Sequence, residues 1–285
     1  MFYLQKNPSS VQVDWNGDPL LTYQYGSGSM PFWHPISMPG SPILTEDRPA
    51  DHIHHHGLWL AWKSVNGVNF WEEPPSGAPE RGYGRIVNTD LDVVEVSSSS
   101  AEFIAASSWL DWRDKEIVSD VRRTLIHRPT DAGFVIDLSI ELLPTAGDVI
   151  LDLRRGEPGQ GGFYYSGLVI CLNDKMGQGE ILDADGHTDI GSIFGNQSRW
   201  CGYSGVHQLN GQRYSVVMID KSANPRYPTT WWVRNRPGYS LLHPSPTYYE
   251  PLKIDAGTSV TFQYKLLFYN GPIPVHDVEL LSRDI

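Results

Sequence analysis

The sequence predicts an all-β protein built as a large antiparallel β-sandwich. Hydrophobic residues recur at every second position in many short segments, which is typical of half-buried strands. Most of these segments are separated by turn-forming residues, among them 27 glycines and 21 prolines. No segment shows helical periodicity over more than about three turns, which argues against crossover helices and a parallel sheet. Because more than about a dozen antiparallel strands do not remain one open twisted sheet, we expect two packed sheets.

The clearest strands are predicted at residues 133–144 and 259–269. The first places Phe134, Ile136, Leu138, Ile140 and Leu142 on one face, and the second does the same with Val260, Phe262, Tyr264, Leu266 and Phe268. Thr261, Gln263 and Lys265 are expected to face outward. Shorter strands are predicted at 10–15, 20–25, 101–109, 117–126, 164–172, 213–219 and 229–233, with a hairpin tip at 97–100. No repeat or linker divides the chain, which favours a single domain over residues 1–285.

Composition excludes several classes of partner. The formal net charge of −11 argues against nucleic acid and anionic membranes, both of which require a basic surface. No apolar run approaches the roughly 20 residues that a membrane helix needs. The first 15 residues lack the pattern of a signal peptide, and Cys171 and Cys201 form no disulfide framework. We therefore expect reduced thiols and a cytoplasmic protein.

The segment RPADHIHHHGLWLAW (48–62) carries four histidines: His52, His54, His55 and His56. If it is extended, His52, His54 and His56 project to one side, where they could hold a divalent metal with an open coordination position. In cupins a glutamate follows the second histidine by a few residues, but here the first carboxylate after the histidines is Glu72. Without a metal, imidazoles can act as general acid and as donors to a developing oxyanion. We favour the metal-free interpretation and expect no cofactor, partly because Gly57 could break the strand alternation.

Tryptophans surround this histidine cluster. Trp33, Trp59, Trp62 and Trp71 lie near it in sequence, and on a strand one of the adjacent pair Trp231 and Trp232 must face outward. Most of the ten tryptophans are expected to fill the interior of the sandwich. An exposed indole beside polar groups would suit stacking on a sugar ring.

The segment 48–73, RPADHIHHHGLWLAWKSVNGVNFWEE, resembles the signature of the PmoA-like proteins, a family of unknown function. Its lead-in at 34–52 and the segments GGFYYSGLVICL (161–172), RWCGYSG (199–205), NPRYPTTWWVRNRPGY (224–239) and LKIDAGTSVTFQYKLLFYNG (252–271) extend the resemblance over nearly the whole chain. Ile53 and His56 depart from it, since the family usually has proline and arginine there. The resemblance implies a galactose-mutarotase-like supersandwich that handles carbohydrate, including oxidised (keto) sugars.

These observations together predict a carbohydrate site around residues 48–59. His54 and His55 are the candidate acids. Glu72, Glu73 and Glu250 are the candidate bases, and Glu250 is favoured because mutarotases carry a catalytic glutamate before their last strand. Arg48 and Arg234 would orient hydroxyl groups. The remaining predicted substrate contacts are Asp51, His52, His56, Trp59, Trp71, Asn224, Trp231 and His243. We expect them around one concave surface.

Three functions remain open from the sequence. The first is an enzyme of the epimerase, mutarotase, lyase or hydrolase type that acts on a small sugar or keto-sugar. The second is a non-catalytic sugar-binding sandwich, and the third is a metalloenzyme with histidine ligands. A histidine general acid predicts activity that declines at alkaline pH, with an apparent pKa in the imidazole range. A homo-oligomer is compatible with all three functions.

Overall fold

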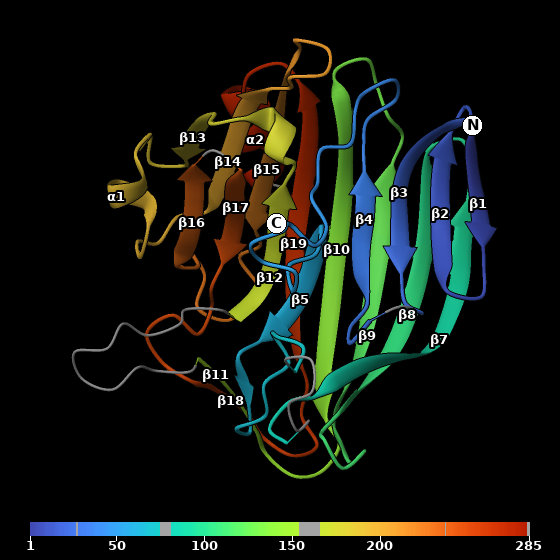
Figure 1. The fold of residues 1–285 in the computed structure, drawn as a ribbon, viewed down its shortest axis with the longest axis vertical. Helices are drawn as coiled ribbons and strands as arrows, with labels where there is room; N and C mark the ends of the chain where they lie inside the picture. The colour runs from blue at the N-terminus through green and yellow to red at the C-terminus, as the bar shows by residue number, and fades with distance from the viewer. Residues whose placement is uncertain (27, 75–80, 154–165, 237, 284–285) are drawn as a thin grey trace.

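The computed structural model describes residues 1–26, 28–74, 81–153, 166–236 and 238–283. These residues form strands β1 to β19, one 3-10 turn and two short α-helices (Figure 1). The ladders between named strands are antiparallel throughout the described ranges. The predicted all-β fold class is confirmed.

The strands form two eight-stranded sheets and one small sheet. The first sheet has the order β1 (Phe2–Lys6), β2 (Ser10–Trp15), β3 (Asp18–Gln24), β4 (Phe32–Ile36), β5 (Leu58–Trp62), β12 (Ser166–Leu172), β17 (Tyr239–Pro244) and β16 (Trp231–Arg236). The second has the order β13 (Glu180–Asp183), β14 (Trp200–Val206), β15 (Arg213–Asp220), β19 (Val260–Asn270), β10 (Gly133–Pro144), β9 (Glu116–His127), β8 (Ser100–Leu110) and β7 (Arg85–Val96). The small sheet comprises β18 (Leu252–Ile254), β11 (Val149–Asp152) and β6 (Ser64–Val65).

Most predicted strands match the structure closely. The strand predicted at 133–144 is β10, and its five predicted inward residues are all buried. In β19 the predicted inward residues are buried apart from Val260, which is partly buried. The serines of 97–100 form the predicted hairpin turn, in which the Ser97 amide donates to the Ser100 carbonyl. Residues 164 and 165 of one predicted strand lie outside the described residues, as do residues 161–163 of the segment that resembles the PmoA-like family. Ten of the described strands were not predicted, and the longest of them is β7.

Aromatic side chains fill the space between the two large sheets. Trp62 of β5 lies 6.2 Å from Trp109 and 5.5 Å from Phe262, measured between ring centroids, and both partners belong to the second sheet. The indole nitrogen of Trp33 in β4 donates to the hydroxyl of Thr124 in β9 at 3.2 Å. Because successive strand residues face opposite sides, the neighbours of these inward residues lie on the outer face of the first sheet.

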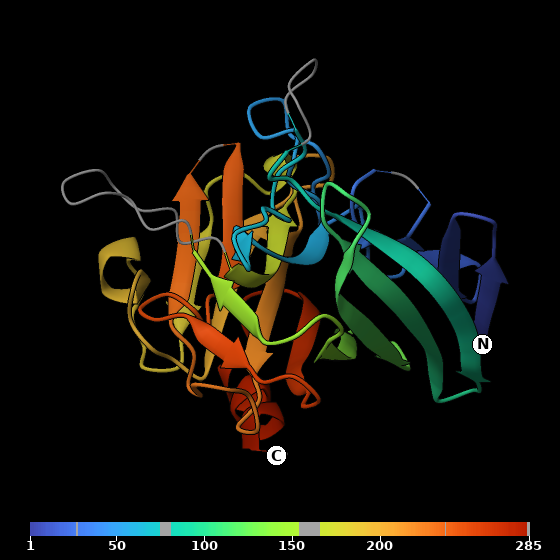
Figure 2. The same cartoon turned by 90° about the horizontal axis from the view of Figure 1, so that it is seen from below.

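Helices make a small contribution to the fold. The 3-10 turn η1 (Asp174–Met176) and helix α1 (Ile190–Ile193) are connectors. Helix α2 (Val275–Arg283) packs Val278 on Trp200, Val217, Ile219 and Leu267 of the second sheet, and it is visible at the lower edge of Figure 2. Among the residues described, no helix combines the length and apolar character needed to cross a bilayer.

Candidate functional site

The outer face of the first sheet gathers the predicted site from five strands. The register pairs Phe32 of β4 with Trp59 of β5, and Trp232 of β16 with His243 of β17. Residues that are directly paired across antiparallel strands project to the same face. Cys171 of β12 also faces this side, because its sulfur lies 3.7 Å from Nδ1 of His55. We call this surface, with His52, His54, His55 and His56 above it, the histidine face.

The histidines lie in a turn and not in an extended strand. The His52 amide donates to the Pro49 carbonyl at 2.9 Å, and the His55 amide donates to the His52 carbonyl at 2.8 Å. Gly57 then passes so close to β4 that a Cβ there would lie 2.6 Å from the carbonyl oxygen of Trp33. The predicted alternation that puts His52, His54 and His56 on one side is therefore wrong, since consecutive turns and a glycine replace the extended geometry.

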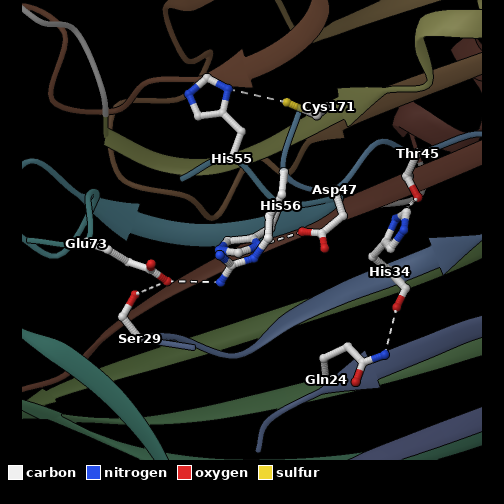
Figure 3. A network of polar contacts seen from close by, with 10 residues as sticks. Gln24, Ser29, His34, Thr45, Asp47, His55, His56, Glu73 and Cys171 are labelled. Carbon is white, nitrogen blue, oxygen red and sulfur yellow. Dashed lines mark hydrogen bonds and ion pairs between the residues drawn. The ribbon is translucent and has the colours of Figure 1, made fainter. Parts of the chain in front are cut away.

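Three of the four imidazoles pack together and the fourth points elsewhere. The ring of His55 stacks on His52 at 4.8 Å and meets His54 edge-on at 4.5 Å. His56 turns away and donates from Nδ1 to the Asp47 carboxylate at 2.7 Å, as Figure 3 shows. The predicted metal set of His52, His54 and His56 therefore does not form in this arrangement. In the described ranges, the only trio of potential ligand residues with donor atoms within 4.8 Å is Asp183, Asp185 and His187.

His55 is held as a neutral imidazole. The side chain is 1% exposed, and burial together with the neighbouring histidines lowers its pKa from 6.5 to about 2. The thiol of Cys171 remains protonated, because burial raises its pKa. A thiol that donates to Nδ1 of His55 leaves the ring hydrogen on Nε2. His55 therefore offers a neutral N–H donor but cannot act as an imidazolium acid at neutral pH, which corrects one of its two predicted roles.

Glu72 and Lys63 form a charged pair beside His54. Lys63 is almost fully buried and contacts the Glu72 carboxylate, which also accepts from the side-chain amide of Asn69 at 3.1 Å. Burial opposes ionisation of Glu72, but Lys63, Asn69 and His54 together lower its pKa. Burial also lowers the pKa of the half-buried His54, while the charge of Glu72 raises it. Glu72 is thus an ionised carboxylate next to a neutral imidazole.

Arg48 and Glu73 form a second ion pair next to the first. The guanidinium of Arg48 lies 3.1 Å from the Glu73 carboxylate, which also accepts from Ser29 at 3.4 Å. The Arg48 amide donates to the carbonyl of His55 at 2.7 Å, so this residue closes the histidine turn. Arg48 has a φ of 53°, a conformation that is uncommon for residues other than glycine. Asp51 lies 3.0 Å from Nδ1 of His52 at the exposed rim.

Aromatic rings connect the turn to the far strands of the sheet. Trp59 and Trp71 lie 5.2 Å and 6.4 Å from His55. Trp71 stacks on His243 at 5.4 Å, and His243 in turn meets Trp232 at 5.9 Å. The guanidinium of Arg234 lies 4.3 Å above the ring of Trp232. Because Trp59, Trp71 and Trp232 are at most 3% exposed, their faces are occupied by the protein, and sugar stacking on Trp59 or Trp71 is not available in this structure.

Two predicted site residues do not join the histidine face. Trp231 points into the sandwich, where its indole donates to the Ser198 carbonyl at 2.8 Å. Asn224 binds Asp220 and the backbone of Gln263 on the second sheet. The outward member of the tryptophan pair is Trp232. The pairing of Trp232 with His243 across β16 and β17 shows which of the two tryptophans faces outward, whereas alternation along one strand could not.

Glu250 lies in an exposed loop after β17, and its carbonyl accepts from Arg226. In the described part of the chain, no hydrogen bond or ion pair joins its side chain to the histidine face. Its role as a base stays a prediction that no contact supports. Tyr239, which stacks on His52 at 4.5 Å, was not predicted to contribute, and neither were Cys171, Asp47 and Lys63. Asp47 and Lys63 directly flank the segment 48–62, whereas Cys171 and Tyr239 are distant from it in sequence.

Asp220, the partner of Asn224, should make stability depend on pH. Burial raises the pKa of its carboxyl from 3.8 to about 7, although Asn224 and the Thr229 amide lower it. A carboxyl whose pKa is raised by folding stabilises the protein when protonated, and this contribution is lost as pH rises from about 4 to about 7. We expect the stability difference between wild type and Asp220→Asn to shift in favour of the variant as pH rises over that interval. Urea unfolding at pH 4.5 and pH 8 measures it, and a pH-independent difference would contradict this expectation.

Four buried polar atoms of the histidine face have no hydrogen-bond partner among the residues that the structure describes: Nε2 of His55, Nε2 of His56, Nε1 of Trp59 and Nδ1 of His243. His243 uses its other nitrogen, which lies 2.7 Å from the Ser166 carbonyl, and burial lowers its pKa to about 4. Nε1 of Trp59 and, with the Cys171 thiol donating to Nδ1, Nε2 of His55 are N–H donors, whereas the nitrogens of His56 and His243 donate or accept according to the ring tautomer. Leaving each unpaired costs about 1–3 kcal/mol. Their concentration on one face is typical of a site that binds a polar ligand.

Sequence comparison assigns the chain to a family. The profile described as a family of unknown function (DUF6807) matches residues 10–282. The chain belongs to this family. None of the curated proteins matches it in sequence. The family itself has no established function, so membership leaves the activity open.

Two solved structures resemble the fold remotely. One is a proposed kojibiose phosphorylase from the human microbiome, which is 9% identical with a TM-score of 0.38. That alignment covers 99% of this chain and 35% of the other, so this chain spans about a third of that protein. The other, HI1317, is 8% identical with a TM-score of 0.28, and 94% and 99% of the two chains are covered. The likeness to PmoA-like proteins and galactose mutarotases stays a prediction.

Proposed function

We propose that the protein is an enzyme that acts on a sugar or keto-sugar by acid–base chemistry at the histidine face. The observation that carries this proposal is the group of four unpaired polar atoms beside the His54–Glu72 pair. Sugar hydroxyl groups both donate and accept, which matches a face that offers N–H donors and imidazole nitrogens. His55 is packed against the half-buried rings of His52 and His54, so we expect these two rings to shift when the ligand enters.

The protonation states favour proton transfer at a carbon next to a carbonyl group. A neutral His54 can remove that proton, and the imidazolium so formed is stabilised by the ionised Glu72. The neutral Nε2–H of His55 can donate to the oxygen on which negative charge develops. This pair of roles fits epimerisation or elimination of a keto-sugar. A protonated carboxylic acid, which glycoside hydrolysis usually requires, is not offered by Glu72, because Lys63 and Asn69 lower its pKa.

The expected pH profile follows from these roles. A base must be deprotonated, and burial lowers the pKa of His54 below 6.5. We expect kcat/KM to rise with pH through an apparent pKa below 6.5 and then to stay level to about pH 9. This differs from the alkaline decline that the sequence predicts for a general acid. The assay is NMR observation of aldoses and their keto derivatives, with solvent-deuterium exchange at carbon as the readout.

Two outcomes of this experiment would contradict the proposal. If no sugar in the panel exchanges or is converted, the enzymatic function is wrong and a sugar-binding role remains. A decline of kcat/KM between pH 6 and pH 8 would instead restore the general-acid role and remove His54 as the base.

A further inference from the structure

A cavity of about 340 Å³ lies next to the histidine face. Its walls include Ser29, Glu73, Tyr83, Asp111 and Trp112, which come from the β3–β4 connection, the segment before β7 and the β8–β9 hairpin. The volume falls within the range of pockets that enclose small ligands. The residues of the histidine turn are not among those that line the cavity.

The ion pair of Arg48 and Glu73 connects the cavity to the histidine face. Glu73 lines the cavity, while the adjacent Glu72 carries the charge that acts on His54. Glu72 and Glu73 are consecutive residues, so one short backbone segment contributes to both sites. Gly28 lies against this ion pair, since a Cβ there would lie 3.2 Å from the Arg48 guanidinium and 3.5 Å from the Glu73 carboxylate. Its φ of 85° also favours glycine.

The lining has the chemistry of a sugar subsite. Tyr83 and Trp112 are half-buried aromatic side chains, which can pack on the apolar face of a pyranose ring. The Ser29 hydroxyl and the carboxylates of Glu73 and Asp111 can bind hydroxyl groups. The wall is rigid on the Asp111 side, because one oxygen of Asp111 accepts from the backbone amides of Arg113 and Lys115 at 2.8 Å and 3.0 Å.

We propose that this cavity is a second sugar subsite and that the substrate is a glycoside of at least two rings. The inference rests on the proposed function, because it places the reacting ring at the histidine face. The second ring occupies the cavity between Tyr83 and Trp112, with Glu73 binding its hydroxyl groups. A monosaccharide would leave the cavity to water.

The test compares binding of single and linked sugar rings. Glucose and galactose are titrated beside maltose, cellobiose and lactose by isothermal calorimetry, with wild type, Trp112→Ala and Tyr83→Ala. In wild type we expect at least one disaccharide to bind about tenfold or more tightly than its monosaccharide, which corresponds to about 1.4 kcal/mol. Each variant should lose that preference and keep the monosaccharide affinity. Tyr83→Ala keeps the test valid if Trp112→Ala does not fold.

The possible results distinguish the second subsite from the proposed function. A monosaccharide that binds as tightly as every disaccharide overturns the second subsite and leaves the proposed function standing. The same holds if both variants retain the disaccharide preference. If none of the five sugars binds, the second subsite is overturned, whereas the proposed function is tested separately by the solvent-deuterium exchange assay with keto-sugars.

Discussion

Replacing Asp120 by asparagine is expected to destabilise the protein by about 3–5 kcal/mol. Asp120 and Arg122 are 0% exposed, and their bidentate contact includes a nitrogen–oxygen distance of 2.7 Å. The indole of Trp109 also donates to Asp120 at 2.6 Å. The substitution leaves a guanidinium buried between the sheets without a counter-ion, and a lone buried charge is much more costly than a solvated one. The unfolding midpoint in urea measures the loss.

A matched control at an exposed ion pair distinguishes the effect of burial on stability from the effect of ion pairing itself. Asp114 binds Arg85 at 2.7 Å, but the two side chains are 69% and 44% exposed. Asp114→Asn should therefore cost no more than about 1 kcal/mol, because solvent screens the pair. A double variant, Asp120→Asn with Arg122→Met, should recover part of the stability since it removes the unpaired charge. If Asp120→Asn costs as little as the control, the buried pair is not required for stability.

The buried pair of Asp120 and Arg122 also helps to position the candidate site. Arg122 donates to the Pro31 carbonyl at 3.2 Å, immediately before β4, and its guanidinium lies 5.9 Å from the ring of Trp33. The outer side of the same strand carries Phe32, which stacks on His56 at 4.2 Å. Packing between the sheets therefore positions the strand on which the histidine turn rests.

Replacing His54 by glutamine is expected to lower turnover by about 10²- to 10⁴-fold, the usual contribution of a general base. Binding of the sugar should change little, because His54 is not among the residues whose unpaired atoms are expected to hold the ligand. The loss should therefore appear in kcat and not in the dissociation constant. Single-turnover NMR on the substrate found in the sugar screen, with calorimetry for binding, measures both quantities.

The control for this prediction is a histidine of the other sheet. His127 is paired with Asp137 at 2.6 Å and belongs to β9 of the second sheet, outside the histidine face. His127→Gln should leave turnover within about threefold of wild type. Equal activity of His54→Gln and wild type would remove His54 from the reaction, whereas a parallel loss in both variants would point to a defect in folding.

Local patterns in the sequence predicted nine of the nineteen described strands. Alternation over 133–144 identified β10 and its buried face, because side-chain direction in a strand depends only on the position along it. The same criterion missed β7, an edge strand in which Val87, Val93, Val94 and Val96 are exposed, so apolar residues do not mark an inner face. The sequence also placed His54, His55, Glu72, Trp71 and His243 in one site, and contacts in the structure join them.

Tertiary structure decided the geometry and the charges of that site. The spacing of His52, His54 and His56 suggested a strand, but close approach of Gly57 to Trp33 and hydrogen bonds within the turn direct His56 away from the other two rings. The choice of Trp232 over Trp231 depends on its pairing with His243, which lies on another strand. The neutral state of His55 depends on burial beside Cys171, which is 116 positions away in the sequence. A sequence specifies local direction along each strand, whereas pairing between strands and burial depend on residues that folding alone brings together.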